Sequence, residues 1–90
     1  MPEIDGDKIR QEIGLKIRYV RLLKKMTQET LEWNSNVSRR QISDIECGLC
    51  DCKITTLIKL VDALDMTITD FISIEVPRNF KDGMRKVHGE

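Results

Sequence analysis

Residues 27–46 read TQETLEWNSNVSRRQISDIE, and this stretch decides the fold. Thr27 and Ser38 can each accept hydrogen bonds from the free N–H groups that open a helix. An apolar residue precedes each of them and another follows four positions later, which is the hydrophobic staple that sets how the chain enters a helix. Residues 34–36 between the two starts tolerate left-handed backbone angles. Gln41 adds a Ser-x-x-Gln capping box, so the stretch predicts helix, turn, helix.

The same pattern, a capping residue with an apolar residue before it and another four positions later, recurs outside this stretch. Asp5 lies between Ile4 and Ile9 and is the expected N-cap of a first helix running to about Lys24, with Asp7 as the alternative cap. Gly48 can end the second helix of the pair in a left-handed conformation, and a fourth helix should begin near Lys53. A fifth should follow Thr67. Apolar side chains at helical spacing predict the buried faces of the first and fourth helices: Ile9, Ile13, Ile17 and Val20 in the first, and Ile54, Leu57, Leu60, Val61 and Leu64 in the fourth.

Composition places the chain in the all-α class. Its 90 residues suit one small domain, 40% of them are hydrophobic, and only 4% are aromatic. The net charge is zero, but residues 8–53 hold ten Lys and Arg against six Asp and Glu. The positive excess therefore lies on the predicted helix pair, where it suits a nucleic-acid partner. The absence of a long apolar run and of a signal peptide predicts a soluble cytoplasmic protein without membrane contact.

The predicted helix pair and the segments that flank it resemble the Cro/repressor helix-turn-helix family, also called XRE-like, over roughly residues 9–72. The resemblance implies a compact five-helix bundle of the lambda-repressor-like fold, with a short C-terminal arm. We expect the helix-turn-helix domain to occupy residues 1–75, and residues 76–90 to form an arm or tail that is either dimer-associated or disordered. The matching positions are Ile13-Gly14, Ile17-Arg18, Val20-Arg21, Thr27-Gln28, Leu31, Val37-Ser38, Ile42-Ser43, Ile45-Glu46, Gly48, Leu57, Leu60, Ala63-Leu64, Ile68 and Phe71.

In this family the second helix of the pair enters the DNA major groove and contacts bases with its first turn. The resemblance therefore implies sequence-specific binding of double-stranded DNA by a transcriptional regulator, and we favour a repressor. Arg39 and Arg40 are the expected base-reading residues, since Arg can donate two parallel bonds to guanine. Gln28 is expected to bind a phosphate, and Lys53 and Arg18 are further candidates for backbone contacts. Ser38, Gln41, Ser43 and Asp44 complete the expected DNA-binding set.

Two positions have competing interpretations. Gln41 either reads adenine or is used in the capping box. Asp44 either accepts a bond from cytosine or pairs with Arg40 four residues earlier, and we favour the pairing. Arg21 and Glu46 match family positions that form a partly buried salt bridge between the first and third helices, which is a structural role.

Cys47, Cys50 and Cys52 form a C-x-x-C-x-C pattern beside the recognition helix. Their odd number argues against a disulfide framework, and His88, the only histidine, lies in the tail. We therefore expect reduced thiols, no metal and no cofactor, with a metal- or thiol-responsive regulator as an alternative. Trp33 is the most conspicuous apolar residue on the short second helix, and it suits either extra packing or a protein partner.

A single short recognition helix makes few base contacts, so we expect a homodimer on a pseudo-palindromic operator with half-sites about 34 Å apart. The chain has no nucleophile–base arrangement and no glycine-rich phosphate loop, so we expect no enzyme. The alternative function is a helix-turn-helix fold used as a protein-interaction module, such as an antitoxin or coactivator. The expected dimer seam consists of Ile68, Phe71, Ile72, Ile74, Val76 and Phe80.

Overall fold

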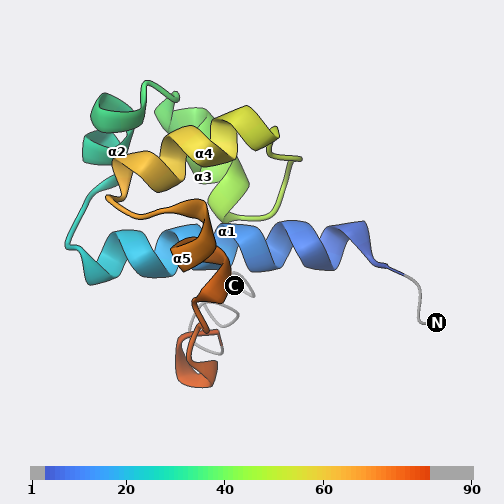
Figure 1. Ribbon diagram of the computed structural model, residues 1–90. Coiled ribbons are helices and arrows are strands. Elements are labelled where there is room, and N and C mark those ends of the chain that lie inside the picture. Colours follow the sequence, from blue (N-terminus) through green and yellow to red (C-terminus); the bar gives the residue numbers. More distant parts are fainter. Residues whose placement is uncertain (1–3, 82–90) are drawn as a thin grey trace.

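The computed structural model describes residues 4–81, in which short links join five α-helices and one further helical turn (Figure 1). The helices are α1 (Gly6–Leu23), α2 (Gln28–Ser35), α3 (Arg39–Glu46), α4 (Ile54–Ala63) and α5 (Ile68–Ser73), and the extra turn covers residues 78–81. The prediction of an all-α bundle is confirmed. No helix among residues 4–81 has the length and apolar character needed to cross a membrane.

Four of the five helices begin with the side-chain caps that the sequence predicts. The side chains of Asp5, Thr27, Ser38 and Thr67 accept backbone N–H bonds at 3.0 to 3.2 Å. Each such cap typically stabilises a helix by about 1 kcal/mol. Helix α4 is the exception, because its N-cap residue Lys53 makes no side-chain capping bond. Its position therefore depends on packing.

Three helices end in the same reversal, a Schellman motif with the residue after the C-cap in the left-handed region. These residues are Lys25, Gly48 and Asp65, with φ of 55°, 72° and 60°. At each site the next two N–H groups return to carbonyls of the last helical turn, as with Met26 N to Arg21 O at 3.0 Å. Of these three, only Gly48 adopts this conformation without a steric cost. At Lys25 and Asp65 the conformation lowers the stability of the fold by roughly 1 kcal/mol each.

The core gathers apolar side chains from all five helices. Its fully buried members are Ile17, Val20, Leu31, Ile42, Ile45, Leu60, Val61 and Leu64, with Val37 and Phe71 beside them. Two predicted core positions are wrong, since Ile9 is 42% exposed and Ile54 is 64% exposed. Both lie near the start of a helix, since α1 begins at Gly6 and α4 begins at Ile54 itself. In Figure 1 the N-terminal part of α1 extends beyond the other helices, so none of the other helices among residues 4–81 covers that end.

Gly14 allows α1 and α3 to touch backbone to backbone. A Cβ atom placed on Gly14 would lie 2.1 Å from the carbonyl oxygen of Ile45 and 2.8 Å from that of Glu46. Neither atom is at the end of a flexible side chain, so neither can move aside. The close crossing of α1 and α3 therefore requires glycine at this position.

Part of the expected C-terminal arm is helical. Residues 74–77 have no regular structure, but residues 78–81 form a helical turn in which Phe80 N and Lys81 N bond to Pro77 O. Proline suits the start of such a turn because its missing N–H is not needed there. Phe80 packs edge-on against Tyr19 of α1, with ring centroids 5.2 Å apart. The predicted tail beyond residue 81 lies outside the described residues.

Gly14→Ala should destabilise the protein by about 1–3 kcal/mol or more, because the added methyl group forces α1 and α3 apart. Gly6→Ala is the matched control in the same helix, since its Cβ would meet only the end of the Arg10 side chain at 3.4 Å. Urea unfolding followed by circular dichroism measures both. Equal stability of the two variants would contradict the close crossing.

Candidate nucleic-acid interface

A buried ion pair ties the end of α3 to α1. Arg21 Nε lies 2.8 Å from Glu46 Oε2, and Arg21 Nη2 lies 3.0 Å from Glu46 Oε1. The third nitrogen, Nη1, donates to the carbonyl of Met26 at 2.8 Å. The two residues are only 7% and 4% exposed, and the pair is bidentate. The structure thus joins the two residues that the family resemblance pairs, and their geometry fixes the orientation of α3.

The first turn of α3 faces solvent. Ser38, Arg39, Arg40 and Gln41 are all exposed, whereas Ile42 and Ile45 on the other face of the same helix are buried in the core. The arrangement presents two guanidinium groups and an amide on a helix whose back is anchored. Such groups can donate to phosphate oxygens and to the edges of bases.

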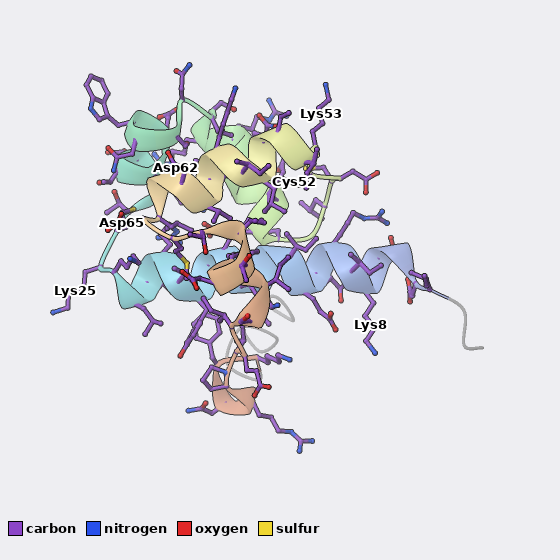
Figure 2. The ribbon with its side chains drawn as sticks, viewed as in Figure 1. Lys8, Lys25, Cys52, Lys53, Asp62 and Asp65 are labelled. Carbon is purple, nitrogen blue, oxygen red and sulfur yellow. The ribbon has the colours of Figure 1, made fainter. Side chains whose placement is uncertain are left out.

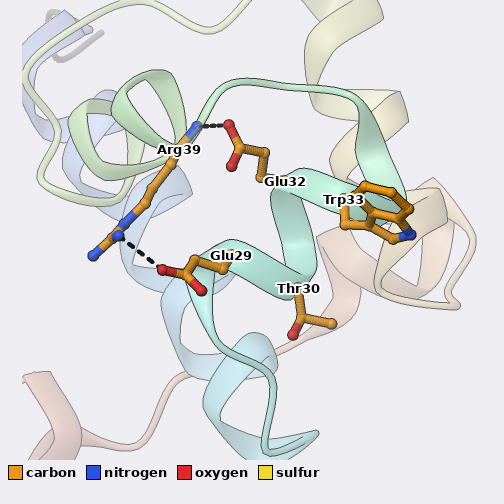
Figure 3. Close-up of a pocket in the computed structure, with 5 residues that line it drawn as sticks. All are labelled: Glu29, Thr30, Glu32, Trp33 and Arg39. Atoms are coloured by element: carbon orange, nitrogen blue, oxygen red, sulfur yellow. Dashed lines mark hydrogen bonds and ion pairs between the residues drawn. The ribbon is translucent and has the colours of Figure 1, made fainter.

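Arg39 is held by two carboxylates of α2 (Figure 3). Its Nη1 atom lies 3.1 Å from Glu29 Oε1, and its backbone N–H donates to Glu32 Oε2 at 2.9 Å. Glu32 therefore supplies a second cap to α3, in addition to Ser38. Sequence reasoning missed both contacts. Glu29 and Arg39 are ten residues apart on different helices, so no local spacing signals the pair.

The capping box at Ser38 is half formed. Gln41 N donates to Ser38 Oγ at 3.2 Å, but the bonds of residues 4–81 include no return bond from the Gln41 side chain. This leaves the exposed amide available to another partner.

The favoured interpretation of Asp44 is wrong, because the ion pairs within the described range do not join Arg40 to Asp44. Arg40 is thus exposed without a carboxylate partner there, and Ser43 and Asp44 are half-buried.

The predicted flanking contacts lie on three elements. Gln28 is half-buried at the start of α2, and its Nε2 atom donates to Glu46 Oε1 at 3.3 Å, next to the buried ion pair. Lys53 precedes α4 and extends into solvent (Figure 2). Arg18 is half-buried on α1, where its Nε atom is buried and has no hydrogen-bond partner among residues 4–81.

The predicted dimer seam is only partly available. The assignment of Phe71 to the dimer seam is wrong, because this residue is 2% exposed and fills the core of its own chain beneath the Lys16 ammonium group. Ile72, which points away from the core on α5, is 65% exposed. Four other predicted members are half-buried: Ile68, Ile74, Val76 and Phe80. Phe71 therefore supports this surface from below, and Ile72 is its most exposed apolar member.

The three cysteines are free and half-buried. Burial raises the pKa of the Cys50 thiol, and the Asp44 and Asp51 carboxylates raise it further. Burial also raises the pKa of Cys52, with Cys50 as the second cause. The Cys50 and Cys52 thiols therefore carry less thiolate at neutral pH than a free cysteine does, and thiolate is the form that binds metals and reacts with oxidants. Within residues 4–81, no group of three His, Cys, Asp or Glu side chains could hold a metal ion.

Trp33 is 87% exposed on α2. Together with Glu29, Thr30, Glu32 and Arg39 it lines a shallow hollow, in which it lies apart from Arg39 (Figure 3). The interpretation of Trp33 as extra packing within the chain is therefore wrong.

Comparison with known proteins identifies a family and two similar solved structures. A family model described as helix-turn-helix matches residues 17–71. The restriction–modification controller protein C.AhdI from Aeromonas hydrophila is 26% identical with a TM-score of 0.68, over 71% of this chain and 97% of that one. The controller C.Esp1396I, crystallised as a tetramer with its natural 35-base-pair operator, is 32% identical with a TM-score of 0.68, over 70% of this chain and 83% of that one. The comparison with curated proteins gave no match.

The matched region contains α2, α3 and the Arg21–Glu46 pair that orients them, so sequence and geometry agree on the same unit. The expected resemblance to the Cro/repressor type is confirmed, and the chain belongs to the helix-turn-helix family that includes the restriction–modification controller proteins.

Proposed function

We propose that this protein is a sequence-specific DNA-binding transcriptional regulator, acting as a repressor, that inserts the first turn of α3 into the major groove. The observation that carries the proposal is the exposed Arg39–Arg40 pair on a helix whose opposite face is locked in the core. A helix enters the major groove readily, and Arg bonds the O6 and N7 atoms of guanine. The similar controller C.Esp1396I is itself found on operator DNA, which supports this assignment.

The charge distribution suits a DNA reader that binds weakly to random sequence. The chain as a whole is neutral, and only residues 8–53 carry a positive excess. Non-specific affinity rises with the number of phosphates that a protein neutralises. A neutral protein therefore gains little from the DNA backbone alone and depends on base contacts for tight binding. Gln28, Lys53 and Arg18 are the residues to which we assign the backbone contacts.

The regulator acts as a homodimer on a pseudo-palindromic operator. One recognition helix of eight residues reaches few bases, and a two-fold pair doubles the contacts. We assign the seam to the surface of α5 and residues 74–80, where Ile72 is exposed. The tetramer formed by C.Esp1396I on its operator supports self-association on DNA.

Trp33 favours a second candidate function, a protein-interaction module. An apolar side chain that is 87% exposed suits a contact with another protein. This function predicts that changes at Arg39 and Arg40 leave the affinity for operator DNA unaffected, whereas DNA reading predicts that they weaken it.

Arg40→Ala should weaken binding to a DNA site selected from a random pool by about 1–3 kcal/mol, and it should relax the preference at one base pair. Lys53→Ala is the control, because loss of a phosphate contact weakens all sequences alike. Fluorescence anisotropy on the selected site and on single-base variants separates the two. Unchanged operator affinity of Arg40→Ala would contradict the groove assignment.

Ile72→Asp should shift the protein from dimer to monomer, because a charge in an apolar seam loses its hydration. Leu23→Asp, at a similarly exposed apolar site on α1, should remain dimeric. Sedimentation equilibrium gives both masses. A dimeric Ile72→Asp protein would place the seam elsewhere.

A further inference from the structure

We propose that Glu29 is a specificity-determining residue, whose carboxylate holds Arg39 ready for a guanine edge and keeps it from binding phosphates in random DNA. The inference rests on the proposed function and deepens it. Nothing in the DNA-binding set expected from the sequence includes Glu29. Its role follows from a contact between α2 and α3 that appears only in the folded chain.

The first step is the geometry of the clamp. Glu29 and Glu32 lie three residues apart on α2, which places them on the same face of that helix. One carboxylate accepts from the guanidinium of Arg39 and the other from its backbone N–H, at 3.1 and 2.9 Å. Both ends of Arg39 are therefore tied to α2, and Figure 3 shows the two contacts together. The clamp restricts where the guanidinium can point.

The second step is the set of donors that remains. A guanidinium has five N–H donors, and the Glu29 bond uses one on Nη1. The edge formed by Nε and Nη2 has no bond within residues 4–81. Two parallel donors are what guanine O6 and N7 accept. Arg39 can thus read guanine while its bond to Glu29 stays intact.

The third step is charge. Because Arg39 is paired with Glu29, it adds no net positive charge at the first turn of α3, and it therefore attracts phosphates weakly. A phosphate oxygen placed against Arg39 would also approach the Glu29 carboxylate and be repelled by it. The pair is exposed, with 59% of the Arg39 side chain and 73% of the Glu29 side chain accessible, and such a pair adds little to folding stability. Its main consequence is therefore for binding.

The test compares Glu29→Gln with wild type on the selected operator and on a random duplex, over a range of salt concentrations. The variant keeps the size of the side chain and removes its charge. We expect random-DNA affinity to rise roughly tenfold at low salt, and the slope of log K against log salt to steepen by about 0.9, as for one added phosphate contact. The ratio of operator to random affinity should fall.

Glu12→Gln is the matched control, because it removes another exposed carboxylate, on α1, for which residues 4–81 show no hydrogen-bond partner. It reports the effect of one unit of net charge. A second control is Glu29→Gln in an Arg39→Ala background, where it should behave like Glu12→Gln. Thermal unfolding should be alike for all carboxylate variants, which separates binding from folding.

If Glu29→Gln and Glu12→Gln change operator and random affinity by the same factors, the role of Glu29 is overturned while the proposed function stands. A wild-type protein that prefers no sequence from the random pool would instead contradict the proposed function itself.

Discussion

The bidentate contact between Arg21 and Glu46 is the constraint on which the recognition surface depends. It joins α1 to the last turn of α3 in a buried environment, and Gly14 lets the two backbones touch beside it. Loss of one partner would leave a buried charge without compensation, which costs about 3–5 kcal/mol. Gln28 also bonds Glu46, so the start of α2 is tied to the same point. One carboxylate therefore sets the positions of α1, α2 and α3.

With its inner face anchored, α3 can expose polar groups at its first turn without losing its orientation. The side chain of Ser38 and the carboxylate of Glu32 both bond to backbone N–H groups at this end of the helix. A well-ordered helix start matters for base reading because hydrogen bonds to base edges tolerate little displacement. Zero net charge fits the same scheme, since discrimination gains when the backbone contributes little.

The helices and their starts could be predicted from the sequence, because caps and staples are local patterns at Asp5, Thr27, Ser38 and Thr67. The Arg21–Glu46 pair was accessible through family resemblance. Contacts between helices far apart in the chain were not: the Glu29–Arg39 bond depends on the angle between α2 and α3. Likewise, apolar spacing gives the face of a helix but not how far a neighbour covers it. Ile54 is exposed for that reason, and Phe71 turns inward to the core.

The most direct test of whether α3 reads the major groove uses operator duplexes in which single guanines are replaced by 7-deazaguanine. This base pairs normally but lacks the N7 acceptor that an Arg in the major groove would use. At the guanine that Arg39 or Arg40 contacts, affinity should fall by about 1 kcal/mol or more, and Ala at that Arg should abolish the difference. Inosine, which removes only the minor-groove amino group of guanine, should bind as guanine does. Unchanged affinity with 7-deazaguanine at every position, together with losses on inosine, would contradict major-groove reading by α3.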